Sequence, residues 1–204
     1  PFENMPRISD RWDQRTKGSD LSELIPGTEY GPPDGLGYEH NWQCASFDIN
    51  LLSDVGMKRK NNEDSCIMCV PKNPQLAETR GILIAVADGM GGASAGEHAS
   101  RMALLNMTRI YYTAEFDTVP VSIGRALEES NRLVFEESES NPEYSGMGTT
   151  VSAVVILGDW AYIAQVGDSR VYLLRERMGI QQLTLDHSLV EEQVRNGLIT
   201  PDEA

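Results

Sequence analysis

The sequence lacks a long hydrophobic run. No apolar stretch in its 204 residues approaches the roughly 20 residues that a membrane-spanning helix requires. No signal-peptide pattern opens the chain either. We therefore expect no membrane span in this segment. Cysteine is scarce as well: three residues cannot all pair in disulfides, which favours a reducing, cytoplasmic environment.

Positive charge is the second shortage. The chain has 17 Lys and Arg against 31 Asp and Glu, a formal net charge of −14 at pH 7. Binding to a nucleic-acid backbone needs clustered cationic side chains, so we expect no nucleic-acid partner. The excess of carboxylates suits a protein that binds divalent cations, although solubility alone also explains it.

What the chain does contain is apolar periodicity typical of an α+β domain over residues 45–204. Alternation at Phe47, Ile49 and Leu51 predicts a half-buried strand, and the continuous run Ile82–Ala87 predicts a strand buried on both faces. The other expected elements are helices over 93–113, 119–138 and 188–196 and strands over 65–70, 149–157, 160–166 and 170–175. Since strands and helices are grouped, largely antiparallel sheets are favoured over a doubly wound parallel sheet.

The two ends of the chain differ from this domain. Residues 1–44 are rich in Pro, Gly and charge, and we predict an irregular N-terminal tail or linker there. An exposed loop is also expected over 71–79. The chain opens on Pro1, and Thr200–Glu203 has the features of a helix start. We therefore expect a fragment of a longer reading frame.

Carboxylates gather at two strand ends. Asp88 directly follows the apolar run, and a buried carboxylate needs a partner such as a metal cation. Glu63 and Asp64 directly precede another expected strand, so the three acids meet at one sheet edge if these strands are neighbours. Mg²⁺ and Mn²⁺ prefer oxygen ligands. The Gly89 carbonyl would add one more, because a residue without a side chain lets a metal approach closely.

An arginine completes this pattern. Arg59 lies four residues before Glu63, and a guanidinium fork beside a metal suits the oxygens of a phosphate group. Together these residues indicate metal-assisted phosphoester hydrolysis. Each one alone is also compatible with an ordinary structural role: a solvated surface residue for Arg59, a turn for Glu63 and Asp64, a strand exit for Asp88 and a hairpin for Asp168.

Six motifs in order make the pattern specific. They are Gly56-x-x-Arg59-x-x-Asn62-Glu63-Asp64, Asp88-Gly89-Met90-Gly91-Gly92, Gly96-Glu97, Gly146-Met147-Gly148-Thr149-Thr150, Gly167-Asp168-Ser169-Arg170 and Leu185-Asp186-His187-Ser188. This set resembles the metal-dependent protein phosphatases, the type 2C serine/threonine phosphatases. The Met-Gly-Gly version of the central turn is similar to the bacterial branch; eukaryotic members usually carry a histidine at the position of Met90.

The resemblance implies a fold and a metal centre. It implies a sandwich of two antiparallel β-sheets flanked by helices, in α/β/β/α layers, with two Mn²⁺ or Mg²⁺ ions at one end. Asp88 would bridge both metals, and Glu63 and the Gly89 carbonyl would complete one of them, with Asp64 nearby. Asp168 matches the position of a third, weaker metal in bacterial relatives.

The resemblance also implies an activity. Arg59 would hold the substrate phosphate, and a metal-bound water would attack phosphorus without a phosphoenzyme. The substrates would be phosphoserine and phosphothreonine in proteins, and the partners Ser/Thr kinases and their substrates. Alternatives are a truncated pseudophosphatase or binding module without turnover, and a phosphatase of a sigma-factor control circuit.

One departure from the family pattern concerns the C-terminal part of the domain. The family carries further metal-binding aspartates downstream, in a Ser-Asp-Gly and an Asp-Asn segment, and neither segment occurs after Asp168 here. We therefore expect the C-terminal third of the domain to be missing and these 204 residues to be inactive alone.

Four other features have weaker claims to function. Cys66 and Cys69 lie in a predicted strand, where residues three apart point to opposite faces, so core packing is expected rather than zinc binding. His98 is expected at the surface. His187 follows Asp186 near a flap of the family, where it would influence substrate access. The glycines of residues 89–92 lack the Lys-Ser/Thr of a nucleotide-binding loop.

Overall fold

The fold is built on one antiparallel sheet covered by two long helices. The computed structural model describes residues 21–44, 47–114, 118–188, 193–194 and 196–200. Its helices are α2 (Leu21–Leu24), α3 (Pro74–Arg80), α4 (Ala93–Thr113), α5 (Val119–Ser140) and the 3₁₀ helix η2 (Pro142–Tyr144). Its strands are β1 (Thr28–Gly31), β2 (Tyr38–Gln43), β3 (Asp48–Ser53), β4 (Asp64–Cys69), β5 (Ile82–Met90), β6 (Gly148–Thr149), β7 (Val151–Leu157), β8 (Trp160–Val166), β9 (Tyr172–Arg175) and β10 (Gly179–Gln182).

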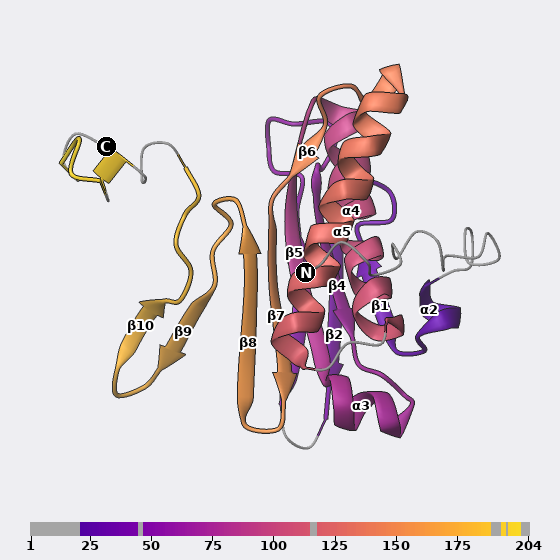
Figure 1. Ribbon diagram of the computed structural model, residues 1–204, viewed down its shortest axis with the longest axis vertical. Helices are drawn as coiled ribbons and strands as arrows, with labels where there is room; N and C mark the ends of the chain where they lie inside the picture. Colours follow the sequence, from indigo (N-terminus) through magenta and orange to yellow (C-terminus); the bar gives the residue numbers. More distant parts are fainter. Residues whose placement is uncertain (1–20, 45–46, 115–117, 189–192, 195, 201–204) are drawn as a thin grey trace, which may run out of the picture.

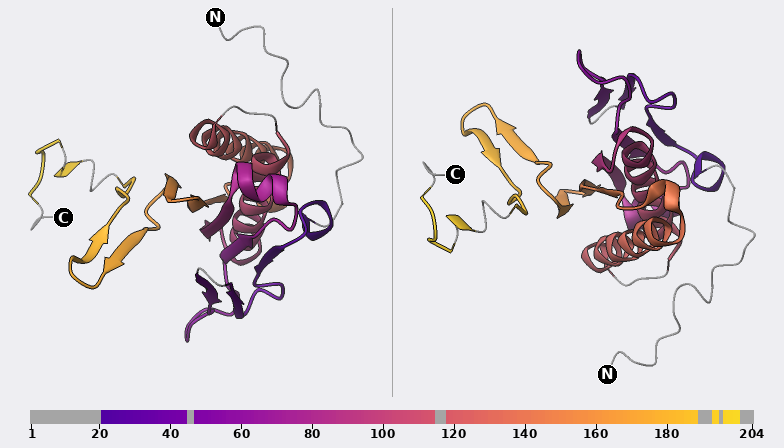
Figure 2. Two further views of the ribbon diagram at one scale, coloured as in Figure 1. Left: turned by 90° about the horizontal axis from the view of Figure 1, so that it is seen from below. Right: turned by 90° about the horizontal axis from the view of Figure 1, so that it is seen from above.

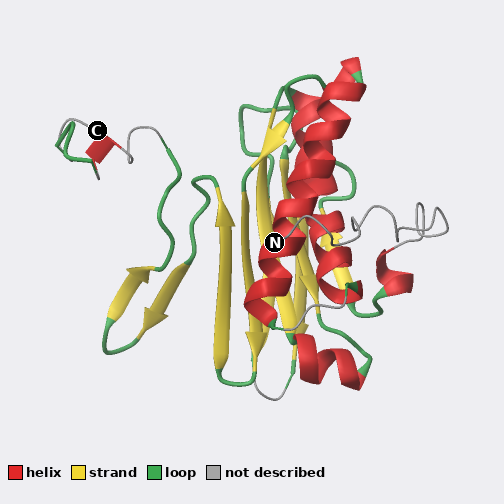
Figure 3. Cartoon of the chain, viewed as in Figure 1, coloured by secondary structure: helices red, strands yellow, loops and turns green. Residues whose placement is uncertain are grey.

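The main sheet has six strands. Five follow the order β1-β4-β5-β7-β8, and β6 pairs with the end of β5; all these pairings are antiparallel. Two hairpins, β2–β3 and β9–β10, form separate two-stranded sheets. The grouping of strands and helices is clear in Figure 3. The predicted α+β class with antiparallel sheets is therefore confirmed.

Helices α4 and α5 lie together over one face of the main sheet (Figure 1). Every second residue of β5 faces them: Leu83, Ala85 and Ala87 are buried in the main core. The core residues of α4 are small near its start and larger toward its end, namely Ala95, Ala99, Ala103, Leu104, Met107, Ile110, Tyr111 and Tyr112. Alanines on both elements let the helix axis approach the sheet closely, which explains why β5 and α4 pack so tightly.

The β2–β3 hairpin lies on the opposite face (Figure 2). Ile49 and Leu51 are buried against Cys66 and Met68 of β4, so the predicted half-buried strand is confirmed. The prediction that the Ile82–Ala87 strand is buried on both faces is wrong at its second half. The hairpin reaches only the first part of β5, and Val86 remains 43% exposed.

Residues 21–44 contain regular structure, contrary to the predicted irregular tail. Strand β1 pairs with β4, with Thr28 opposite Cys69, and β2 pairs with β3. The folded unit therefore includes residues before 45. Thr28 and Cys69 are 41 positions apart, and a four-residue strand has too short a pattern to reveal such a distant pairing. Residues 1–20 lie outside the described part of the chain.

Two smaller predictions also need correction. The segment expected as a loop over 71–79 contains α3, whose first turn is capped by the Asn73 side chain accepting hydrogen bonds from the backbone of Gln75 and Leu76. Asparagine followed by proline is a helix start, and the segment is too short to show a period. Strand β10 is an element that the sequence pattern did not predict. The helix expected over 188–196 lies largely outside the described residues.

The β9–β10 hairpin projects away from the main sheet (Figures 1 and 2). Its apolar residues are accordingly exposed: Leu174, Met178 and Ile180 are each at least two-thirds accessible. No helix in the described part of the chain is long and apolar enough to cross a bilayer.

The expected core role of Cys66 and Cys69 is confirmed, and it predicts their reactivity. The two thiols face opposite sides of β4, and burial raises the pKa of each to about 11. Because the thiolate is the reactive form, a thiol reagent at pH 8 is expected to modify half-buried Cys44 first and the other two only after urea unfolding. Mass spectrometry of the labelled protein checks this order; rapid labelling of Cys66 in the native protein would contradict it.

Candidate metal centre

Asp64 and Asp88 lie directly opposite each other on neighbouring strands. Asp64 opens β4, and its Cα partner across the antiparallel ladder is Asp88 near the end of β5. Both residues are exposed, on the face of the sheet turned away from α4. The expectation that the carboxylates meet at one sheet edge is therefore confirmed for Asp64 and Asp88, whereas the burial expected for Asp88 is not.

Like charges directly opposite on a sheet destabilise it. Partial burial raises the pKa of Asp64, and so do the charge of the neighbouring Asp88 carboxylate and a side-chain hydrogen bond with it. A proton or a cation between them relieves this repulsion. A positively charged partner therefore stabilises Asp88 because it offsets the repulsion from Asp64, and not because Asp88 is buried.

Arg59 and Glu63 stand beside this pair. The Nη1 atom of Arg59 lies 3.9 Å from Oε2 of Glu63. The Glu63 side chain is only 15% exposed, while that of Arg59 is 64% exposed. Arg59 also acts to lower the pKa of Asp64, against the larger effects that raise it. A solvent-accessible guanidinium at the rim of an acidic cluster can reach the oxygens of an incoming anion.

The backbone of Glu63 is fixed by two elements. Its carbonyl accepts a hydrogen bond of 3.1 Å from the Gly89 amide and one of 2.7 Å from the Ser100 hydroxyl of α4. Ser100 is fully buried and is itself within 2.9 Å of the Ser65 hydroxyl. Ser100 was not among the predicted site residues; no local pattern marks a helix serine whose partner lies 37 positions earlier.

Two glycines bring β5 against the first turn of α4. A Cβ atom on Gly89 would lie 2.0 Å from the Gly96 carbonyl oxygen, and one on Gly96 would lie 2.7 Å from Oε2 of Glu63. Gly89 therefore excludes a side chain, because its neighbours are backbone atoms, whereas a side chain at position 96 would displace the Glu63 carboxylate. The Glu63 carboxylate lies over the N-terminal turn of α4, where the helix dipole favours a negative charge.

A second chain segment closes over Asp88. Its backbone amide donates to Oγ1 of Thr150 (3.0 Å), and its carbonyl accepts from Oγ1 of Thr149 (2.9 Å). The Thr150 hydroxyl is in turn 2.7 Å from that of Ser169. Two motifs that are far apart in the sequence thereby meet at the end of β5. The threonines fix the Asp88 backbone, a role that the sequence alone did not indicate.

Asp168 lies next to Ser169 in an exposed turn. Within the described ranges its carboxylate makes no hydrogen bond or ion pair. The Gly167 amide, just before it, donates to Nδ1 of His187 (3.3 Å), and the His187 amide donates to the Gly167 carbonyl (3.0 Å). His187 therefore holds the turn that carries Asp168. The third-metal role of Asp168 stays a prediction.

An ion pair closes the base of the β9–β10 hairpin. Arg170 holds both oxygens of Asp186: its Nη2 lies 2.6 Å from Oδ2, and its Nε 2.9 Å from Oδ1. These hydrogen bonds lower the pKa of the Asp186 carboxyl. Both residues belong to the quoted motifs, but the sequence did not predict their pairing across 16 positions.

His98 and Met90 flank the glycine turn. His98 is half-buried rather than at the surface, with its ring stacked 4.1 Å from that of Tyr144 at an interplanar angle of 13°. Met90 is 65% exposed at the end of β5. Met90 has no ionisable group to offer the acidic cluster, and the ring of His98 packs against Tyr144.

The carboxylate oxygens of the acidic cluster are ligands of the kind that a hard divalent cation prefers, although few of them converge on one point. Among the described residues, no group of three or more His, Cys, Asp or Glu side chains is arranged to hold a metal ion. Two carboxylates facing each other across a ladder are nevertheless sufficient for Mg²⁺ or Mn²⁺, which keep several waters and often use one or two protein carboxylates with substrate oxygens. Asp64 and Asp88 are the pair that would hold the ion.

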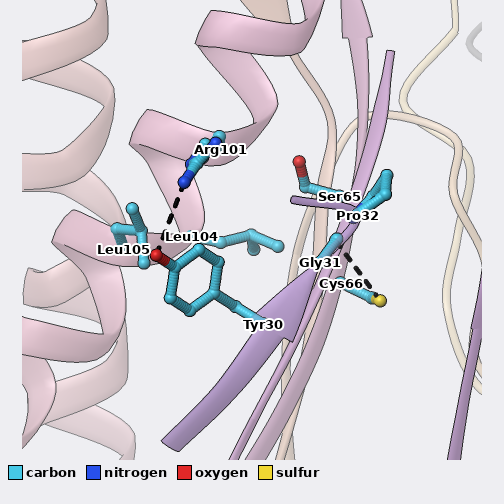
Figure 4. A pocket seen from close by; sticks show the side chains of 8 residues that line it. All are labelled: Tyr30, Gly31, Pro32, Ser65, Cys66, Arg101, Leu104 and Leu105. Atoms are coloured by element: carbon cyan, nitrogen blue, oxygen red, sulfur yellow. Dashed lines mark hydrogen bonds between the residues drawn. The ribbon is translucent and has the colours of Figure 1, made fainter. Parts of the chain in front are cut away.

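A separate small pocket lies between β1 and α4 (Figure 4). Arg101 lies over the Tyr30 ring, 5.2 Å from its centroid, and leucines 104 and 105 complete the apolar wall. It carries no cluster of acidic groups.

Comparison with known proteins agrees with this arrangement. Residues 52–194 match the family "Protein phosphatase 2C". The protein phosphatase PhpP of Streptococcus pneumoniae is 38% identical over 161 residues, which cover 78% of this chain and 62% of the relative. The serine/threonine phosphatase stp of Listeria monocytogenes serotype 4b is 37% identical over 158 residues, 74% of this chain and 59% of the relative.

Solved structures give the same result. Phosphatase PstP/Ppp of Mycobacterium tuberculosis superposes with a TM-score of 0.59 at 29% identity, covering 86% of this chain and 62% of that one. Stp1 of Staphylococcus aureus superposes with a TM-score of 0.64 at 26% identity, covering 88% and 60%. The chain thus spans about 62% of the length of the first relatives it matches. On this evidence, the chain belongs to the protein phosphatase 2C family.

Proposed function

We propose that the protein containing this chain is a metal-dependent phosphatase that hydrolyses phosphoserine and phosphothreonine in proteins, with Mn²⁺ or Mg²⁺ as cofactor. The observation that carries the proposal is the placement of Asp64 opposite Asp88, with Arg59 at the rim of the pair. A doubly acidic ladder position is unfavourable for the fold alone, and its cost is offset when a cation binds.

Each residue has a task that follows from its position. Asp64 and Asp88 hold the cation, and the partly buried Glu63 adds negative charge beside it. Arg59 binds two oxygens of the substrate phosphate with its planar fork and orients the phosphorus toward the acidic cluster. When bound, the metal supplies a low-pKa water and neutralises charge on the phosphoryl group.

The relatives support this assignment. Those of known structure are described as serine/threonine phosphatases, and the catalytic domain of PstP is described as a complex with two manganese ions. Phosphorylated proteins, among them Ser/Thr kinases and their substrates, are the partners that such an activity implies, and the cytoplasm is the compartment in which they meet. A third metal at Asp168 is part of the same proposal.

Arg59 provides a direct test of substrate binding. Phosphate release from a phosphothreonine peptide is measured with Mn²⁺ and with EDTA. The assay uses the 204-residue chain and, in parallel, the product of the whole reading frame that encodes it. The Arg59→Ala variant is expected to lose about 10- to 100-fold in kcat/KM, because a charge-assisted hydrogen bond contributes roughly 1.5–3 kcal/mol. Arg59→Lys should fall between, since a lysine cannot bind two oxygens in a fork.

Arg125 supplies the matched control. It forms a similar exposed pair with Glu128, also at 3.9 Å, on α5. Arg125→Ala should therefore leave the activity unchanged. Full activity in the presence of EDTA, or an Arg59→Ala variant as active as Arg125→Ala, would contradict the proposal.

A binding module without turnover is the second candidate. It is favoured by the small number of converging ligands, since the described residues include no group of three metal-binding side chains. Mn²⁺ binding and phosphopeptide binding without phosphate release, by the chain and by the whole reading-frame product alike, would establish it in place of the enzyme.

A further inference from the structure

Asn62 is a buried amide next to the acidic cluster. It is only 3% exposed. Its Oδ1 accepts a 3.0 Å hydrogen bond from the Asp64 amide, and its Nδ2 donates to the Leu36 carbonyl (3.0 Å) and to the Ser53 hydroxyl (2.8 Å). Both hydrogens of the amide and its oxygen are thus used.

These bonds join three separate parts of the chain. Leu36 lies in the connection between β1 and β2, Ser53 ends β3, and Asp64 begins β4. The Asn62 backbone amide adds a fourth contact, a 2.6 Å hydrogen bond to the Gly35 carbonyl. Asn62 therefore fastens the β2–β3 hairpin, a sheet of its own, to the edge of the main sheet that carries the acids.

The contact with Asp64 is a local turn. An asparagine oxygen that accepts from the amide two residues later fixes the backbone between them, in this case at Glu63. The Glu63 carbonyl is held from the other side by the Gly89 amide. The segment that carries two acidic side chains is consequently clamped at each of its three residues.

Such a clamp opposes electrostatic repulsion. Without a cation, Asp64 and Asp88 repel each other, and the repulsion favours movement of the first residue of β4 away from β5. The start of a strand is held by few ladder bonds, so the side-chain bonds of Asn62 add an important restraint to those that Gly89 and Ser100 place on the Glu63 carbonyl. An aspartate at position 62 would lack both N–H donors of the asparagine amide and would add a further negative charge next to the acidic cluster.

We propose that Asn62 is a positioning residue for the cation site. It holds Asp64 opposite Asp88 and Glu63 beside Arg59 before a cation binds. Cation binding therefore loses little free energy to the ordering of these side chains and their backbone. This inference rests on the proposed function. It assigns no contact between Asn62 and the metal or the substrate.

The test measures Mn²⁺ affinity rather than turnover. The dissociation constant is determined for the 204-residue chain, and in parallel for the product of the whole reading frame, by the electron paramagnetic resonance signal of free Mn²⁺. The Asn62→Ala variant is expected to bind Mn²⁺ about 10- to 100-fold more weakly, the usual effect of removing a group that orients a metal ligand. Hydrogen exchange of the Asp64 amide should accelerate in the same variant.

Asn73→Ala is the matched control. Asn73 also accepts backbone hydrogen bonds, at the start of α3, so its loss weakens the fold without touching the acidic cluster. Its Mn²⁺ affinity should equal that of the unaltered chain. Should Asn62→Ala fail to fold, Ser53→Ala, which removes one bond of the amide, carries the test with about threefold weaker binding expected.

The possible results distinguish failure of the positioning role from failure of the proposed function. If the unaltered chain binds Mn²⁺ and Asn62→Ala, or Ser53→Ala in its place, binds it as tightly as Asn73→Ala does, the positioning role is overturned while the proposed function stands. If neither the unaltered chain nor the product of the whole reading frame binds Mn²⁺, the proposed function and the inference both fail.

Discussion

Replacing Asp88 by asparagine is expected to reduce metal-dependent phosphate release by about 10³-fold or more, since direct metal ligation contributes several kcal/mol to the stabilisation of transition-state charge. The same change should make the metal-free protein slightly more stable, by about 0.5 kcal/mol, because it removes the like charge opposite Asp64. A loss of activity combined with a gain in stability is the result expected for a carboxylate whose role is to bind a cation.

The pH dependence of stability gives a second measurement on the same pair. The pKa of Asp64 is raised in the folded state by partial burial and by Asp88. The charged form therefore destabilises the fold at neutral pH, and stability is gained as pH falls through the raised pKa. In Asp88→Asn this gain should shrink, because one cause of the raised pKa is absent.

Urea unfolding of the metal-free protein at several pH values measures both effects, and the phosphopeptide assay measures the activity. Asp159→Asn, in the exposed turn between β7 and β8, is the control and should change neither. A destabilised Asp88→Asn protein that still releases phosphate in response to Mn²⁺ would contradict the assignment of Asp88.

The second large effect is expected at Gly89. In Gly89→Ala the new methyl group would lie 2.0 Å from the Gly96 carbonyl oxygen and 2.7 Å from that of Glu63. Both neighbours are backbone atoms and cannot rotate away. Strand β5 and helix α4 must separate, with an expected loss of about 3 kcal/mol in the free energy of unfolding. Because the acids are carried by the same backbone, Mn²⁺ affinity should fall as well.

Gly124→Ala is the control for this change. Gly124 lies inside α5, and nothing stands within 4 Å of the position that its Cβ would occupy. Alanine there should raise the free energy of unfolding by about 0.5–1 kcal/mol, since it restricts the unfolded chain and favours the helix. Urea unfolding of both variants checks the opposite signs. Equal stability of Gly89→Ala and the unaltered protein would show that the close approach of β5 and α4 is unnecessary.

The long, periodic elements could be predicted from the sequence. The helix expected over 93–113 matches α4, and the strand expected over 160–166 matches β8. Each is encoded by side chains within the element, because burial of one face repeats every 3.6 or every 2 residues. The ordered motifs also predicted the acids and Arg59 as members of one site, since six motifs in a fixed order are far more specific than any one of their residues.

Which groups touch each other follows from the folded structure. Several contacts join positions that are distant in the chain: the pairing of β1 with β4 and the hydrogen bonds of Asn62, Ser100 and Thr150. A periodic pattern within one segment cannot indicate which distant segment it will contact. The structure also changed the reason for Asp88: its carboxylate is exposed, and it is destabilised by Asp64 across the ladder rather than by burial. The order of the amino acids is sufficient to place an acid at the end of β5 beside a glycine turn. The antiparallel register determined that a second acid faces it, because a shift of one residue would have placed Asp64 on the other face of the sheet.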